Sequence, residues 1–119
     1  MKITKSHILQ ITLTFILTSC ATTSPISGES KAGDTLKSDV ARQISMQAKI
    51  YGKCERIDSI QTQILKINPV GSGKTAASVR YGSIEERWVA NLCGQNMPFL
   101  VTLTPDGEGG TFFSTTRDK

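Results

Sequence analysis

The fold is decided by a stretch that reads Glu86-Arg87-Trp88-Val89-Ala90-Asn91-Leu92, in which Trp88, Ala90 and Leu92 recur at every second position. Two later stretches alternate in a similar way, Phe99-Leu100-Val101-Thr102-Leu103-Thr104 and Thr111-Phe112-Phe113-Ser114-Thr115. The segments between them, 94–98 and 105–110, are rich in turn-forming residues. Alternation bounded by turns is typical of strands that bury one face, so the sequence predicts an antiparallel β-meander.

Pairing these strands about the middle of each turn predicts their register. It pairs apolar residues across both turns: Trp88 with Leu103, Ala90 with Val101, Leu92 with Phe99, and Leu103 with Phe112. Apolar side chains then meet on one face, as a sheet with one buried face requires. The opposite face would carry Val89, Thr102 and Phe113, so it is not wholly polar.

An amphipathic helix is predicted before the sheet, with Asp34 as its N-cap and Gly52 as its stop. Its apolar residues recur at helical spacing and form one stripe: Leu36, Val40, Ile44, Ala48 and Tyr51. A stripe of this kind indicates a helix that packs one face on the rest of the domain. A partner-binding helix would show the same pattern.

Residues 54–67 are interpreted as a further strand, although Ile57, Ile60, Ile64 and Ile67 also fit helical spacing. The strand is favoured because β-branched residues are frequent and the later strands need a neighbour. Its apolar pattern matches the expected register only in part, which predicts a bulge or a slip. The fold class expected is therefore α+β, with one helix packed on an antiparallel meander of about four strands.

Cys54 and Cys93 are predicted to form a disulfide, because an antiparallel pair of strands would bring them together. The bond would close a loop of about 40 residues, which the chain-entropy model values at roughly 4 kcal/mol. Two independent buried thiols are the alternative. A zinc site is disfavoured because the one histidine, His7, lies in the segment that we expect to be removed.

A glycine-rich segment, Asn68-Pro69-Val70-Gly71-Ser72-Gly73-Lys74-Thr75, ends like a P-loop. The full motif requires a glycine where this chain has Asn68, and no helix with an apolar face is expected to follow. We therefore interpret the segment as a loop between strands, in which Pro69, Gly71 and Gly73 serve as turn residues.

The first twenty residues are similar to a bacterial lipoprotein signal. Lys2 and Lys5 precede an apolar run, Ile8 to Leu17, that at 1.5 Å per residue spans roughly 15 Å and is too short for a transmembrane helix. Leu17-Thr18-Ser19-Cys20 resembles the lipobox, whose cysteine receives lipid. The alternatives are a buried helix with a chance cysteine, or a plain secretory signal.

The lipobox resemblance implies the domain organisation and the location. Residues 1–19 would be the signal peptide, 20–33 a flexible tether, and 34–119 a small α+β periplasmic domain. Cys20 would carry the lipid, palmitate included, that anchors the protein. Ala21 rather than Asp after the cysteine implies sorting to the outer membrane, with the domain facing the periplasm.

The C-terminal third resembles a group of small bacterial envelope lipoproteins of unassigned function. In these, a tryptophan-bearing strand runs into Cys-Gly, here Trp88 to Gly94, and a later turn reads Thr104-Pro105-Asp106-Gly107 followed by Gly109-Gly110-Thr111. The resemblance carries no activity. Ser72-Gly73 is also weakly similar to the Ser-Gly motif of lipoprotein inhibitors of lysozyme, whose continuation is missing here.

The residue types in the mature chain argue against an enzyme. Without a histidine, Ser/His/Asp and Cys/His arrangements cannot form, and adjacent Glu85 and Glu86 would point to opposite faces of a strand. Removal of Lys2 and Lys5 lowers the net charge from +4 to about +2, and no basic face for nucleic acid is expected.

The function expected is that of a membrane-tethered, non-catalytic envelope lipoprotein that acts as a structural or protein-binding accessory. Its partners would be the membrane, through the N-terminal lipid, and another envelope protein, with no cofactor, nucleotide or nucleic acid. The alternative is a periplasmic inhibitor or ligand-binding lipoprotein that uses the loop 68–75.

Overall fold

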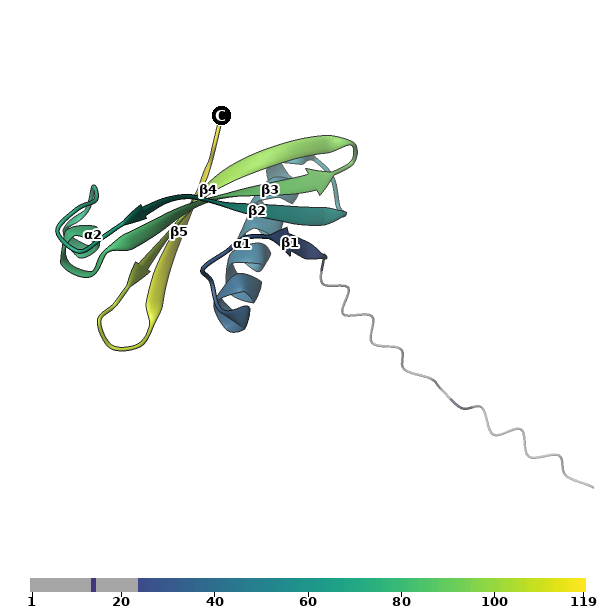
Figure 1. Ribbon diagram of the computed structural model, residues 1–119. Coiled ribbons are helices and arrows are strands. Elements are labelled where there is room, and N and C mark those ends of the chain that lie inside the picture. The colour runs from purple at the N-terminus through teal and green to yellow at the C-terminus, as the bar shows by residue number, and fades with distance from the viewer. Residues whose placement is uncertain (1–13, 15–23) are drawn as a thin grey trace, which may run out of the picture.

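The computed structural model describes Thr14 and residues 24–119, and Figure 1 shows one helix lying against a twisted sheet. The sheet has five strands in chain order: β1 (Ile26–Gly28), β2 (Ser59–Asn68), β3 (Ser83–Leu92), β4 (Gln95–Pro105) and β5 (Thr111–Arg117). The pairs β2–β3, β3–β4 and β4–β5 are antiparallel, whereas β1 pairs with β2 in parallel. The α+β class is confirmed, but the sheet is mixed and has five strands rather than about four. Apart from Thr14, the predicted signal peptide and the lipobox lie outside the described residues.

The turn between β3 and β4 is much tighter than predicted. Cys93 and Gly94 alone connect the strands, and both have positive φ (46° and 71°), as the two central residues of a type I′ hairpin turn require. Trp88 therefore pairs with Phe99 and not with Leu103. The predicted pairs of Ala90 with Val101 and Leu92 with Phe99 are wrong for the same reason, because the partners of these residues are Met97 and Gln95. The shift is four residues, an even number, so every side chain stays on its predicted face.

The turn between β4 and β5 shifts the register by one residue, an odd number. Leu103 pairs with Phe113, and Phe112 lies on the opposite face with 66% of its surface exposed. The cause is a five-residue loop closed by Asp106, whose backbone N–H donates to the Gly110 carbonyl at 3.0 Å and whose Oδ1 accepts from the Glu108 and Gly110 amides. The prediction that Phe112 lies in the core is therefore wrong, and Phe113 packs there instead.

The strand predicted over residues 54–67 is confirmed as β2, with later bounds. Its register with β3 shifts between Ile64 and Lys66, so the expected bulge is present. The glycine-rich loop after β2 leads into a short helix, α2 (Ala76–Tyr81), which the sequence did not predict. Thr75 caps it by accepting the Ser78 amide, and its one buried residue is Ser78.

The predicted amphipathic helix is α1 (Asp34–Gly52), and it covers one face of the sheet, called here the inner face. Val40, Ile44 and Ala48 are fully buried against Trp88 and its neighbours in the core. Two details of the prediction are wrong. Tyr51 is 54% exposed, because it lies over the last residues of edge strand β5, and the N-cap is Gly33 rather than Asp34, which lies in the first turn.

The segment expected to be a flexible tether, residues 20–33, is part of the folded domain from Ser24 onward. Ile26–Gly28 form β1, the Ile60 amide donates to the Pro25 carbonyl at 2.9 Å, and Ala32 is buried. The polar composition of this segment gave no sign of order, because it is held mainly by backbone hydrogen bonds to the edge of β2.

The predicted disulfide between Cys54 and Cys93 is present, with 6.2 Å between the Cα atoms. Cys54 follows the left-handed residue Lys53 that ends α1 and precedes β2, rather than opening that strand. The bond therefore ties the end of the helix to the β3–β4 turn.

Candidate functional site

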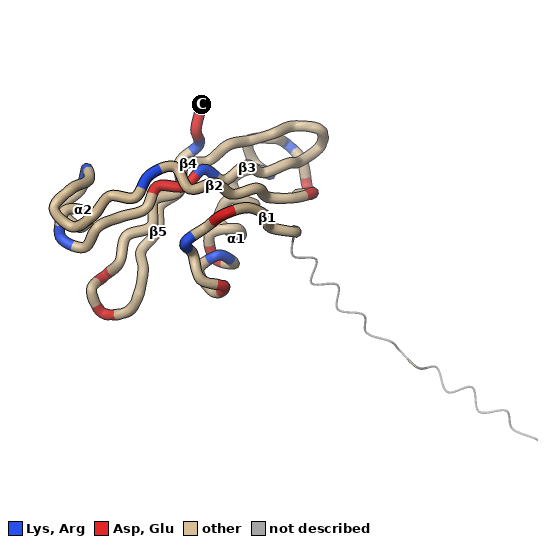
Figure 2. The backbone as a smooth tube through the Cα atoms, viewed as in Figure 1, with Lys and Arg blue, Asp and Glu red and all other residues tan. Residues whose placement is uncertain are grey.

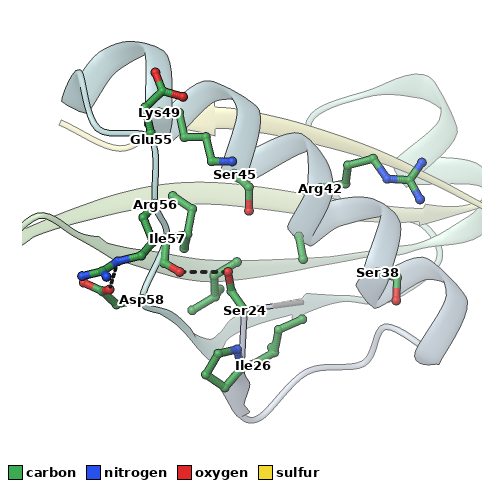
Figure 3. A pocket seen from close by; sticks show the side chains of 13 residues that line it. Ser24, Ile26, Ser38, Arg42, Ser45, Lys49, Glu55, Arg56, Ile57 and Asp58 are labelled. Carbon is green, nitrogen blue, oxygen red and sulfur yellow. Dashed lines mark hydrogen bonds and ion pairs between the residues drawn. The ribbon is translucent and has the colours of Figure 1, made fainter. Parts of the chain in front are cut away.

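A groove lies between α1 and the chain segments that lead into β1 and β2 (Figure 3). Its volume is about 1020 Å³. The groove exists because α1 lies over strands β3 to β5 and leaves the β1 side of the inner face uncovered. We call it the α1–β1 groove; its lining residues are Ser24, Pro25, Ile26, Ser38, Ala41, Arg42, Ser45, Lys49, 55–58 and Ile60.

The floor of the α1–β1 groove is apolar. Ile57 and Ile60 are buried members of the core, and Ile26 and Ala41 pack against that core while partly exposed. One wall is the flank of α1, where Ser38, Ser45 and other polar residues recur about once per helical turn. A bound chain could therefore bury apolar groups below and find hydrogen-bond partners above.

Charged side chains of both signs stand at the mouth of the groove. Arg56 pairs with Asp58 at 3.1 Å on the loop side, and Arg42 lies 3.9 Å from Asp39 on the helix. Lys49 and Glu55 add one more charge of each sign. All are well exposed, so the pairs contribute little to stability, and the mouth has no dominant sign that would select a small anion or cation. Figure 2 shows that both signs are interspersed over the rest of the described chain as well.

The N-terminal segment closes one end of the groove. Ser24 donates its hydroxyl to the Ile57 carbonyl at 3.1 Å, which fixes the chain where it enters the domain. The hydroxyl is therefore engaged with the backbone, and within the described residues no hydrogen bond joins a groove serine to a carboxylate or an amine that could act as its base. The described residues of the groove therefore offer apolar contacts and polar side chains to a bound chain.

The same N-terminal segment is held on its far side by a buried carboxylate. Glu86 is fully buried on the inner face of β3 and accepts three hydrogen bonds: from the Lys31 amide at 2.6 Å, the Ser30 hydroxyl at 2.9 Å and the Trp88 indole at 2.8 Å. Glu85 lies on the opposite face and accepts from Asn68. The sequence correctly placed the two carboxylates on opposite faces, but it did not indicate that one of them fastens the segment after β1.

The glycine-rich loop is occupied by its own hydrogen bonds. The Gly71 amide donates to the Val79 carbonyl, the Ser72 amide and hydroxyl both donate to the Pro69 carbonyl, and Lys74 is exposed. These two amides do not point at a ligand, and Asn68 replaces the glycine that a P-loop requires, which favours the turn interpretation over a phosphate cradle.

The structure brings two of the remaining predicted site residues together and does not describe a third. Cys54 and Cys93 are brought together, whereas Cys20 lies outside the described residues. Asp106 uses its carboxylate to close its own loop. Over residues 24–119 no three His, Cys, Asp or Glu side chains gather as metal ligands would, and none of the described helices is long and apolar enough to cross a bilayer.

Comparison with protein-family models, curated proteins and solved structures gives no match. The groove, the Glu86 contacts and the disulfide are therefore interpreted on their own geometry.

Proposed function

We propose that the protein is a lipid-anchored, non-catalytic accessory of the bacterial envelope that binds an extended segment of another envelope protein in the α1–β1 groove. The lipobox-like Leu17-Thr18-Ser19-Cys20 supports the anchor, with Cys20 as the lipidated residue, and the outer membrane is its proposed location. The observation that carries the binding proposal is the groove itself, with its apolar floor and a mouth that carries both signs of charge.

A polypeptide suits the groove better than a small molecule does. Small-molecule sites bury most of their ligand in about 300–1,000 Å³, whereas this groove reaches the top of that range and is partly open to solvent. An extended chain can place alternate apolar side chains on Ile57 and Ile60 and direct its remaining polar groups to the serines and charges above. Exposed pairs such as Arg56 with Asp58 can exchange partners at small cost, because each is already solvated.

The test is a pull-down from detergent-solubilised envelopes with three forms of the full chain. Ser45→Trp fills the groove from the helix wall, and Val70→Asp alters an exposed residue in the loop after β2, away from the groove, as the matched control. We expect one stoichiometric partner to be retained by wild type and Val70→Asp and lost with Ser45→Trp. A synthetic peptide from the partner segment that cross-links to the groove should then compete with the intact partner.

Retention of the partner by Ser45→Trp, with unchanged thermal stability, would contradict the groove as its site. Intact mass and metabolic acyl labelling test the anchor separately, so loss of one part of the proposal leaves the other measurable.

A further inference from the structure

Residues 24–33, called here the N-terminal strap, are attached to the sheet mainly by hydrogen bonds. The strap contains the three-residue edge strand β1, and its Ser27 carbonyl also accepts from the Thr62 hydroxyl at 3.2 Å. Among its residues only Ala32 is buried, and Ile26 is partly buried. Segments with so few buried apolar contacts open locally at a free energy well below that of global unfolding.

The strap is fastened to the inner face of the sheet at the buried carboxylate of Glu86. Two of the three hydrogen bonds that Glu86 accepts come from the strap, one from the Ser30 hydroxyl and one from the Lys31 amide. No Lys or Arg in residues 24–119 forms an ion pair with Glu86. A buried carboxylate without a cation regains hydration when its cover leaves, which lowers the free-energy cost of opening.

Two glycines mark the joint and the contact surface of the strap. Gly33 joins the strap to α1 at a φ of −67°, and a side chain added there would meet nothing within 4 Å, so its surroundings do not restrain this joint. Gly28 is the opposite case. Its φ is +106°, and a side chain added there would clash with the Thr62 carbonyl oxygen. The strap can therefore lie against β2 only with glycine at position 28.

The strap also forms one side of the α1–β1 groove. Three of the lining residues belong to it: Ser24, Pro25 and Ile26. Figure 3 shows Ser24 and Ile26 on the side of the groove away from α1. The other lining residues lie on α1 and on the chain that leads into β2. When the strap leaves, the groove loses the side that β1 supplies.

We infer that the N-terminal strap opens as one unit, turning at Gly33 and releasing Glu86, while α1 and strands β2 to β5 stay folded. The groove is complete only while the strap is closed, so the strap is a conformational switch for the groove. By linkage, an occupant that contacts Pro25 and Ile26 holds the strap closed. This consequence for binding rests on the proposed function, whereas the opening itself does not.

Hydrogen exchange of the full-length protein in detergent tests the opening. Two reporter amides donate across strap contacts: that of Lys31 to Glu86, and that of Ile60 to the Pro25 carbonyl at 2.9 Å. The two lie far apart in sequence, so a single opening should give them protection factors within about threefold of each other and at least about tenfold below those of the β3–β4 ladder. Unequal protection of the two, or protection equal to that of the ladder, would overturn the inference.

Gly28→Ala and Gly33→Ala make the matched comparison. In Gly28→Ala the two reporter amides should lose their protection, while the β3–β4 ladder stays at least about a hundredfold more protected than they are. In Gly33→Ala both sets should stay within about threefold of wild type. Unfolding of the whole domain in Gly28→Ala, or retained protection of its reporter amides, would overturn the inference.

The synthetic peptide from the partner segment tests the link to the groove. At saturation it should raise the protection factors of the reporter amides at least about tenfold in wild type, and it should bind Gly28→Ala at least about tenfold more weakly than Gly33→Ala. Equal affinity for the two variants would contradict the switch. If wild type retains no partner, the proposed function fails, and the exchange of the two glycine variants still decides whether the strap opens.

Discussion

Trp88 donates its indole N–H to Oε2 of Glu86 at 2.8 Å, and both side chains are fully buried on the inner face of β3. The largest residue of the core and its one fully buried carboxylate therefore form a pair two positions apart on one strand. Because the other hydrogen bonds of Glu86 go to residues 30 and 31, the pair also joins the sheet to the N-terminal segment.

Glu86→Ala should lower the free energy of unfolding by at least about 3 kcal/mol, because it leaves the Trp88 indole and the Lys31 amide without acceptors inside the protein. Chemical denaturation measures the loss. Arg87→Ala, at an exposed position on the outer face of the same strand, is the matched control and should cost less than about 1 kcal/mol, because its ion pair with Asp118 is solvated. Hydrogen exchange at residues 25–32 should rise in Glu86→Ala alone, and unchanged protection there would contradict the fastening role.

Trp88→Ala should cost about 3–5 kcal/mol, as aromatic truncations in packed cores do. Phe112→Ala removes an aromatic side chain that is 66% exposed and should cost less than about 1 kcal/mol. Denaturation curves of both variants, run beside the wild type, make the comparison. Similar shifts for the two would show that the inner and outer faces had been misassigned.

Lys74→Ala should change stability by less than about 0.5 kcal/mol and leave partner binding intact, because Lys74 is exposed in a loop whose Gly71 and Ser72 amides are used internally. The pull-down described for the groove gives the binding readout. Loss of the partner with Lys74→Ala, at unchanged stability, would instead indicate that the glycine-rich loop is a ligand site.

Reduction of the Cys54–Cys93 bond should destabilise the domain by roughly 4 kcal/mol on the chain-entropy model, since the bond closes a loop with a sequence separation of 39. Thermal unfolding with and without reductant measures the effect, and Cys54→Ser with Cys93→Ser should reproduce it. Non-reducing peptide mapping of protein isolated from envelopes should recover the two cysteines in one linked fragment; free thiols at both would argue against the bond.

Cys20→Ala should abolish acyl labelling and leave the N-terminal segment uncleaved or cut elsewhere, because the lipobox requires its cysteine. Metabolic labelling and intact mass report both effects. A wild-type protein without acyl mass, beginning at another residue, would contradict the anchor.

The periodicity of apolar residues was enough to predict the helix and strands that are held by packing of their side chains. The Val40, Ile44 and Ala48 stripe predicted α1, and alternation around Trp88 and Val101 predicted the inner face of the sheet. The disulfide followed because both cysteines lie at ends of elements that the topology brings together.

The features that could not be predicted depend on the backbone and on distant contacts. Cys93 adopts a positive φ, which is unusual for a residue other than glycine. Its disulfide to Cys54, just after α1, holds this turn in place. Ile26–Gly28 form a strand through hydrogen bonds to β2 that composition does not reveal. The groove depends on where α1 lies across the sheet, which no local pattern encodes.

Because the folded domain begins at Ser24, it limits how far from the membrane an anchored protein could hold its groove. Ser24 is fixed at the end of the α1–β1 groove, and four residue steps separate it from Cys20. Even fully extended, these steps reach about 14 Å. With lipid on Cys20, the groove would stay next to the lipid headgroups, whereas a long flexible linker would let it move through the periplasm. Partner capture would then be a two-dimensional search along the bilayer, which favours segments that emerge directly from the same membrane.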